Sequence, residues 1–358
     1  MKKIVYIINH HAPYIDPLIF QLHSMRNVNL TTISLYDEPT THPEWNINFE
    51  KDDQVRCIKI PVLGDLHLNV IKIIKSKQPD LVVVSGHYPL INTLLISYCV
   101  LHHINYLYKF DTVQESNNPI SRYIQRKSIV NATGLFINGK KTIDFLKRVG
   151  IETKLIIKGG YCLDIKKESS HFKKYMYERD EMRKKMAIKS NEFVFLFVGK
   201  VIPSRRIYSF LKNNIVNLSD NIRLLIIGDG PESEIIDSIK DDRILHIEKV
   251  EYSDIYRFYA IADAYFHPGK EPYSLALVQA VIAKLPIVTS NDVGAAMDYV
   301  IDGKNGYIIK NNEITAYSLY MNKVYMDGID SNYTRRQYEL LVKESDLFHI
   351  ANEIININ

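Results

Sequence analysis

The sequence predicts an α/β protein made of two doubly wound, Rossmann-like domains. Short apolar segments alternate with amphipathic helical segments along the chain, a pattern that is typical of parallel strands joined by crossover helices. A charged stretch over residues 165–190 interrupts the alternation, so that the expected strands fall into two series. The chain has 358 residues, which is long enough for two domains of ordinary size.

The first series supplies six expected strands, with helices between them. The strands are expected at residues 3–9, 31–36, 80–86, 105–110, 134–138 and 154–158. Helical patterns cover residues 17–25, 66–76 and 92–101. The N-terminal segment MKKIVYIIN has a basic start but only a short apolar run and no small-residue cleavage site. It is therefore expected to be the first strand and not a signal peptide.

The second series also supplies six expected strands, followed by a final helix. These strands are expected at residues 193–199, 223–228, 244–247, 264–268, 286–290 and 307–310. Apolar residues such as Ile350 and Ile354 recur at helical spacing in the last helix, expected at residues 345–355. We place the domains at residues 1–168 and 169–342. Doubly wound sheets bind ligands at the carboxyl ends of their strands, so functional residues are sought there.

The composition excludes several classes of function. A formal net charge of +4 is too small to indicate a nucleic-acid-binding protein. Cys57, Cys99 and Cys162 are far apart and the twelve histidines lack ligand spacing, so no metal is expected. The thiols are expected to be reduced, in a cytoplasmic protein. The sequence offers no stretch of about 20 apolar residues that would span a bilayer.

A basic cluster stands out in the first half of the chain. Its cations are Arg122, Arg126, Lys127, Lys140, Lys141, Lys147 and Arg148, with Tyr123, Ile124 and Phe145 among them. Such a cluster suits peripheral contact with anionic lipid headgroups, here on the inner face of the cytoplasmic membrane. A solvated helix face is the alternative interpretation.

The segment KEPYSLALVQAVIAKLP, residues 270–286, is the most informative about function. Glu271 and Pro272 are expected to open a helix just after a strand that ends in FHPG. A carboxylate beside a helix N-terminus suits the binding of an anionic ligand and its polar appendage.

Three further turns accompany this segment. In FVGKVIPSRR, residues 197–206, Lys200 and Arg205 are close enough to converge on one anion. In LLIIGDGPE, residues 224–232, Gly228 allows a tight turn from strand to helix. The segment DGKNG is expected to be a hairpin turn with a structural role.

Taken in order over residues 197–309, these motifs resemble the donor site of retaining family 4 glycosyltransferases, of the kind that assemble bacterial surface polysaccharides. The resemblance implies the GT-B fold, in which two doubly wound domains face each other across a cleft. It implies that residues 1–168 bind the acceptor and residues 169–342 the nucleotide-sugar donor. It also implies that the C-terminal helix, about residues 343–358, crosses back to the first domain.

The family's roles can be carried over residue by residue. Glu271 is implied to orient the donor sugar and is the first catalytic candidate. Lys200 and Arg205 are implied to hold the diphosphate, in loops shaped by Gly199 and Gly228.

The same helix start is implied to hold the rest of the donor. The backbone amides that follow Tyr273, those of Ser274 and Leu275, are implied to meet the diphosphate, and Gln279 the ribose. Two departures stand out, because the family has Gly at position 274 and Glu at position 279. We expect Gln279 to weaken donor binding without abolishing it, and Gln279→Glu to preserve or improve it. The hydroxyl of Ser274 is expected to reach a phosphate if the amide geometry is kept.

The first half carries the acceptor-side candidates. NHHAPYIDPLIFQL resembles the start of some polysaccharide-assembling transferases, which points to His10, His11 and Asp16; a plain loop role is the alternative. Asp111, after the strand NYLYKF, is the second catalytic candidate, with a helix cap as the alternative. The remaining candidates on this side are His87 and Glu115.

The implied function is retaining, metal-independent transfer of a sugar from a UDP- or GDP-linked donor to a hydroxyl of a glycan or lipid-linked saccharide. The implied setting is bacterial capsule, O-antigen or exopolysaccharide biosynthesis, and no cofactor is expected besides the nucleotide-sugar substrate. Two alternatives stay open: a non-catalytic subunit that binds nucleotide sugars, and a nucleotide-sugar epimerase with the same fold.

Overall fold

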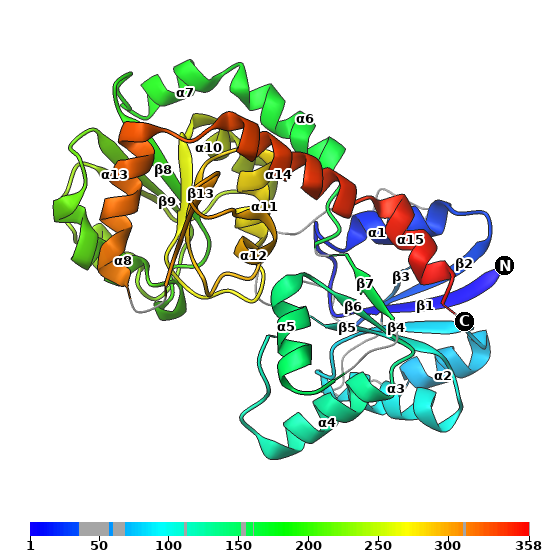
Figure 1. Ribbon diagram of the computed structural model, residues 1–358. Coiled ribbons are helices and arrows are strands. Elements are labelled where there is room, and N and C mark those ends of the chain that lie inside the picture. Colours follow the sequence, from blue (N-terminus) through cyan, green and yellow to red (C-terminus); the bar gives the residue numbers. More distant parts are fainter. Residues whose placement is uncertain are drawn as a thin grey trace. The chain divides into compact units, whose positions relative to one another are not determined.

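The computed structural model forms two compact units (Figure 1). Unit 1 comprises Met1–Asp164 and Glu344–Asn358, and unit 2 comprises Ile165–Lys343. The structure describes residues 1–35, 57–59, 69–110, 113–151, 155–159, 161–310 and 313–357. Each unit has its own parallel sheet, with helices from the same unit packed on it.

The described strands of unit 1 form a seven-stranded sheet in the order β3-β2-β1-β4-β5-β6-β7. The strands are β1 Lys2–Ile8, β2 Val28–Ser34, β3 Cys57–Lys59, β4 Leu81–Ser85, β5 Tyr106–Phe110, β6 Gly134–Ile137 and β7 Ile156–Lys158. The helices are α1 Asp16–Ser24, α2 Asn69–Lys77, α3 Leu90–Leu101, α4 Pro119–Val130, α5 Lys140–Arg148 and α15 Leu347–Ile355. Every strand pair is parallel, and the strand order reverses between β1 and β4, as in doubly wound sheets.

Apolar layers cover both faces of this sheet, because successive strand side chains point to opposite faces. From β1, Val5 and Ile7 join one buried cluster, while Ile4 and Tyr6 join the other. Helix α15 completes the second cluster through residues such as Ile354 and packs beside α1 (Figure 1). The last residues of unit 1 are therefore part of its core.

Unit 2 contains a six-stranded parallel sheet in the order β10-β9-β8-β11-β12-β13. The strands are β8 Phe193–Val198, β9 Ile222–Ile227, β10 Ile244–Ile247, β11 Ala264–His267, β12 Ile287–Ser290 and β13 Gly306–Ile309. The helices are α6 Ile165–Met176, α7 Arg179–Lys185, α8 Ile207–Asn214, α9 Ser233–Asp237, α10 Ile255–Ile261, α11 Leu275–Ile282, α12 Ala296–Tyr299, α13 Tyr317–Asp327 and α14 Ser331–Glu344. The order reverses between β8 and β11, which places a switch point where β8 and β11 end.

The α/β fold class with two doubly wound sheets is confirmed, and one local expectation is wrong. The turn at residues 302–306 exists, since Gly303 N–H donates to Gly306 O at 2.8 Å and Ile308 N–H to Asp302 Oδ1 at 2.9 Å. However, β13 begins at Gly306 and pairs in parallel with β12, so the turn does not close a hairpin. Strand β3 has no counterpart among the expected strands, because a three-residue strand gives no periodic signal.

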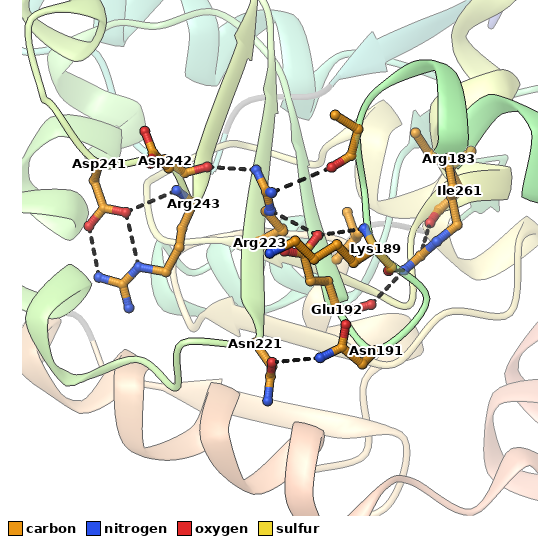
Figure 2. Close-up of polar contacts among 12 residues, drawn as sticks. Arg183, Lys189, Asn191, Glu192, Asn221, Arg223, Asp241, Asp242, Arg243 and Ile261 are labelled. Carbon is orange, nitrogen blue, oxygen red and sulfur yellow. Dashed lines mark hydrogen bonds and ion pairs between the residues drawn. The ribbon is translucent and has the colours of Figure 1, made fainter.

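The charged stretch that separates the two strand series forms α6 and α7 and is held by buried polar contacts (Figure 2). Arg183 is 8% exposed and donates to the carbonyl oxygens of Ile261, at 2.9 Å, and Glu192. The Glu192 carboxylate accepts from Arg223 Nε at 3.0 Å and from Lys189 N–H at 2.7 Å. These residues lie beside the starts of β8 and β9. The network therefore holds the amino ends of the strands, at the opposite end of the sheet from the carboxyl ends that carry the candidate site.

Candidate functional site

Two glycine-containing loops touch through their backbones at the carboxyl ends of β8 and β9. A Cβ atom on Gly228 would lie 1.9 Å from Gly199 O, and one on Gly230 would lie 2.2 Å from Val201 O. Gly228 and Gly230 also have φ values of 136° and 159°, which side-chain-bearing residues rarely adopt. Val201 N–H also donates to Asp229 O at 2.8 Å, so the two loops are in direct backbone contact and form one continuous surface.

The loop after β11 joins this floor through Gly269. A Cβ atom there would lie 2.3 Å from Arg205 Cα, so the two backbones are in direct contact. Lys270 N–H donates to Ser204 O at 2.8 Å, and the Arg205 guanidinium donates to Lys270 O. The sheet order β8-β11 thus brings together two segments of sequence that are about 65 residues apart.

The chemical centre of the three loops is the carboxylate of Glu271. Its Oε1 lies 3.1 Å from Arg205 Nη2, and its Oε2 lies 3.1 Å from His267 Nε2. Gly269 N–H donates to His267 Nδ1 at 3.3 Å, which leaves the ring proton on Nε2, where it is donated to the carboxylate. The Glu271 side chain is 21% exposed, so the carboxylate is oriented on two sides and still open to a ligand.

Two opposing influences act on the pKa of Glu271. Burial raises it, but the hydrogen bond from His267, the charge of Arg205 and the hydroxyl of Ser274 together bring the pKa below its usual value. The carboxylate is therefore ionised at neutral pH. Sequence reasoning did not assign a role to His267, although a histidine at a strand end four residues before a glutamate was a signal for one.

Helix α11 begins later than expected. Glu271 still pairs with Val293 in an isolated bridge, and the helix starts at Leu275 with Ser274 as its N-cap. Ser274 has φ 104° and takes the conformation that glycine adopts easily. Ser274 is fully buried, and its hydroxyl accepts from Leu277 N–H at 3.3 Å.

The other residues of the segment are packed to different degrees. Tyr273 is buried, and its carbonyl accepts from Ala295 N–H at 2.9 Å. Leu275, at the first turn of α11, is half-buried. Gln279 is only 2% exposed, and its Oε1 accepts from the Tyr259 hydroxyl at 3.2 Å. The amides at the start of α11 face away from the helix, as helix N-termini do.

Lys200 lies apart from Arg205, in the wall of an open cavity of about 440 Å³. The cavity is lined by Lys200, Ile202, Asp229, Gly230, Pro231, Ser233, Glu248 and Lys249. It follows the ends of β8, β9 and β10 and carries both charge signs. Arg205 is not among the residues that line this cavity.

In unit 1, two of the three residues expected after β1 form a pair. His11 Nδ1 lies 2.8 Å from Asp16 Oδ1, and Asp16 is the first residue of α1. Burial raises the pKa of Asp16, and the bond from His11 and the charge of Lys109 oppose that rise. His10 is half-buried next to this pair in the sequence.

The remaining candidates in unit 1 are placed differently. Both ring nitrogens of His87 are used, by the Tyr108 hydroxyl at 3.1 Å and Ser121 Oγ at 3.2 Å, and burial lowers the pKa of His87. Glu115 is paired with Arg126 at 2.6 Å. Asp111 lies outside the described residues.

The basic cluster presents an exposed face of α4. Ile120 and Tyr123 are 71% and 63% exposed, beside the exposed side chains of Arg126 and Lys127. Phe145, in contrast, is 4% exposed and belongs to the apolar core, so it is not part of this surface.

The described residues show neither a metal site nor a spanning helix. Within those ranges, no three His, Cys, Asp or Glu side chains gather to hold a metal ion. In the same part of the chain, every helix is too short or too polar to cross a bilayer. Cys99 and Cys162 are free and buried, and burial raises the pKa of their thiols to about 12 and about 11.

Residues 178–339 match the family described as glycosyl transferases group 1. The chain is 30% identical over 141 residues to the alpha-monoglucosyldiacylglycerol synthase of Acholeplasma laidlawii. The match covers 37% of this chain and 35% of the synthase. It is 24% identical over 166 residues to the capsular polysaccharide biosynthesis glycosyltransferase CapM of Staphylococcus aureus. That match covers 44% of this chain and 43% of CapM. The chain thus spans less than half the length of either relative.

Solved structures resemble the whole chain. HepE of Anabaena, solved in complex with UDP, aligns with a TM-score of 0.74 at 15% identity, covering 99% of this chain and 98% of that one. A glycosyltransferase from Rickettsia africae gives a TM-score of 0.73 at 15% identity, covering 99% and 96%. At these identities the likeness shows the fold alone, and the expected GT-B fold is confirmed. The chain therefore has the GT-B fold, and residues 178–339 within it match the glycosyl transferases group 1 family.

Proposed function

We propose that this chain is a retaining glycosyltransferase that moves a sugar from a nucleotide-sugar donor to a hydroxyl of a glycan or lipid-linked saccharide. The observation that carries the proposal is the Glu271 carboxylate, held by Arg205 and His267 just before the start of α11. This arrangement lies inside the segment that matches the group 1 family.

The donor is proposed to lie along the carboxyl ends of the unit 2 strands. The cavity beside Lys200 has the volume for a nucleoside, and the start of α11 offers its first backbone amides and a positive dipole end to a diphosphate. HepE binds UDP and UDP-glucose, which makes UDP sugars the first donors to test. Arg205 retains further N–H donors beyond those given to Glu271 and Lys270, so its fork can also meet a phosphate oxygen.

The reaction proposed for this site breaks the bond between the sugar's anomeric carbon and the diphosphate. A new bond forms from the acceptor hydroxyl oxygen to the same carbon, the hydroxyl proton passes to a phosphate oxygen of the leaving group, and the nucleoside diphosphate departs. Positive charge builds on the sugar, so Glu271 is placed to orient its hydroxyls and stabilise that charge, while Lys200, Arg205 and the α11 amides stabilise the leaving diphosphate. Cations supplied by the chain make a metal unnecessary in this proposal.

The acceptor is proposed to meet residues of unit 1, with Asp111 as the second catalytic residue. The curated relatives make a glycolipid and a capsular polysaccharide, as their names state, which supports a lipid-linked or glycan acceptor in bacterial surface biosynthesis. The exposed face of α4, with Ile120 and Tyr123 beside Arg126 and Lys127, suits peripheral binding to an anionic cytoplasmic membrane. Asp111→Ala is expected to lose turnover, and near-normal turnover would remove Asp111 from the proposal.

Donor binding and transfer are tested separately. UDP, GDP and their sugars are screened by thermal shift, since a ligand that binds only the folded state raises the melting temperature. Transfer is then measured with the matching donor and saccharide acceptors, and the anomeric configuration of the product is read by NMR. Glu271→Ala is expected to abolish transfer, whereas Glu251→Ala, at an exposed glutamate of the same unit, is expected to leave it unchanged.

The other outcomes favour the alternative functions. Binding of a nucleotide sugar without transfer to its correct acceptor would favour a non-catalytic binding subunit. Conversion of the donor when no acceptor is present would favour an epimerase. An inverted product would contradict the retaining mechanism, and no melting shift with any nucleotide would contradict the donor site itself.

A further inference from the structure

The segment that carries Glu271 lies against the loop that follows β12. Glu271 N–H donates to Asp292 O at 3.3 Å, and Gly294 N–H donates to Glu271 O at 3.0 Å. A Cβ atom on Gly294 would lie 1.8 Å from Pro272 O, so the two backbones are in direct contact. The backbone position of Glu271 therefore depends on residues 291–295, which we call the β12 loop.

Arg206 connects the β12 loop to the loop that follows β8. Its Nη2 lies 3.8 Å from Asp292 Oδ2, and Lys270 Nζ lies at the same distance from that oxygen. The side chains of Arg206 and Asp292 are 23% and 25% exposed, so most of each is shielded from solvent. The neighbouring Arg205 reaches the Glu271 carboxylate. The two consecutive arginines therefore hold two loops that lie side by side.

Arg206 has a backbone conformation that residues other than glycine rarely adopt. Its φ of 57° and ψ of 25° lie in the left-handed region, at the N-cap of α8. Glycine takes this conformation at little cost, whereas a side chain strains it. A partly exposed ion pair adds little to stability, so stability alone does not account for an arginine at this position. Backbone strain of this kind is concentrated at sites where a side chain has a functional role.

We propose that Arg206 is a positioning residue for Glu271: by pairing with Asp292 it fixes the β12 loop, and through that loop the backbone of Glu271. The inference rests on the proposed function, in which Glu271 orients the donor sugar. A displacement of about 1 Å in a catalytic group can cost roughly 100-fold in rate, so a smaller movement of the β12 loop is expected to show in kcat. Neither Arg206 nor Asp292 lines the cavity beside Lys200, so the affinity for the nucleotide alone is expected to be independent of the pair.

The test compares the full-length wild type with Arg206→Gly, Arg206→Lys and Asp292→Asn. Transfer from the matching nucleotide sugar gives kcat and KM, and calorimetry gives the dissociation constant of UDP. Arg206→Gly and Asp292→Asn are each expected to lower kcat about tenfold, while KM for the donor and the dissociation constant of UDP stay within about threefold of the wild type. Arg206→Lys keeps the positive charge and is expected to retain at least about one third of the wild-type kcat.

The double variant Arg206→Gly with Asp292→Asn shows whether the two residues act as one unit. Each single change removes the same ion pair, so the double variant is expected to lose no more than about tenfold in kcat. Losses that multiply to about 100-fold would show that Arg206 and Asp292 act separately. That result would overturn the proposal, because the β12 loop would not be fixed by their pairing.

Lys284 supplies a matched control in the same unit. It is an exposed cation at φ 58°, and its Nζ lies over the ring of Tyr338, so Lys284→Gly makes the same change of charge and backbone freedom outside the Asp292 pair. Lys284→Gly is expected to leave kcat unchanged. Arg206→Gly relieves the left-handed strain, so its melting temperature is expected to lie within roughly 2 °C of the wild type. A fall in kcat that comes only with a larger loss of melting temperature would indicate a merely structural role and overturn the proposal.

The remaining outcomes separate the positioning role from the proposed function. Near-normal kcat in both Arg206→Gly and Asp292→Asn would overturn the positioning role and leave the proposed function intact. About tenfold weaker UDP binding by Arg206→Gly would mean that Arg206 contacts the diphosphate itself, which also overturns the positioning role. A wild type that transfers no sugar from any nucleotide sugar would overturn the proposed function, and this inference with it, before any variant is compared.

Discussion

Two opposing effects on stability meet at Ser274. Its backbone conformation is one that residues with a side chain rarely adopt, and its side chain makes a hydrogen bond that glycine could not make. Its φ of 104° lies where residues other than glycine are strained, while its hydroxyl accepts from Leu277 N–H at the start of α11. Ser274→Gly removes the strain and the hydrogen bond together. Ser274→Ala removes the hydrogen bond and keeps the strain, so the pair of variants separates the two effects.

The expected magnitudes differ in sign. Holding a residue other than glycine in such a region costs of order 1–3 kcal/mol of stability. Glycine at this position avoids that cost, but its greater freedom in the unfolded chain removes about 0.7 kcal/mol of the gain. Losing the cap costs only a few tenths of a kcal/mol when Gly replaces Ser, and about 1 kcal/mol when Ala does. We therefore expect Ser274→Gly to stabilise unit 2 by about 1 kcal/mol and Ser274→Ala to destabilise it by about 1 kcal/mol.

The assay is thermal unfolding of the full chain, followed by calorimetry so that a transition of unit 2 is distinguished from one of unit 1. For a unit of this size, 1 kcal/mol corresponds to roughly 2–4 °C in melting temperature. Ser274→Gly is expected to melt above the wild type and Ser274→Ala below it. If Ser274→Gly melts no higher than Ser274→Ala, the strain is negligible and the reasoning is wrong.

Three further predictions test the loops and the carboxylate of unit 2. Gly228→Ala is expected to lower the free energy of unfolding by more than about 3 kcal/mol, because its Cβ would overlap Gly199 O. Gly303→Ala is the control, since Gly303 also has a positive φ but open space around it, and it should lose about 1 kcal/mol. Equal losses in chemical unfolding would contradict the backbone contact. Because the folded pKa of Glu271 lies below its usual value, ionisation of Glu271 stabilises the fold above about pH 4.5, and this contribution disappears as the pH falls through the folded pKa. Glu271→Gln should therefore flatten the fall of the melting temperature below about pH 4.5. An unchanged slope would argue against the His267 contact. Lys200→Ala is expected to weaken UDP binding about tenfold in calorimetry, and an unchanged affinity would remove Lys200 from the donor site.

Much of the fold was predictable because periodicity reports burial on the faces of strands and helices. The strands of both sheets were expected within a few residues of their observed bounds, apart from β3 and the turn at residues 302–306. The prediction of a hairpin failed because Asp-Gly-Lys-Asn-Gly has the local chemistry of many turns, whereas the parallel pairing of β13 with β12 is decided by the sheet.

The sequence predicted candidate site residues but gave little information about their contacts. The pairing of Arg205 with Glu271 was not predicted, because the β8 and β11 loops are neighbours only through the sheet order. The contact of Gln279 with the Tyr259 hydroxyl was also beyond local reasoning, because Tyr259 lies on α10, 20 residues away in the sequence. Such contacts depend on packing between elements, about which a single sequence gives little information.

The discontinuity of unit 1 has a consequence for how the protein forms during translation. The first part of this unit is made early, but the apolar face completed by Ile350 and Ile354 stays uncovered until residues 344–358 have emerged. At about 5–20 residues per second, the intervening residues 165–343 take roughly 10–35 s to synthesise. Unit 2 therefore has all of its strands before unit 1 has its last helix, and the half of the chain that is translated first is the half that is completed last.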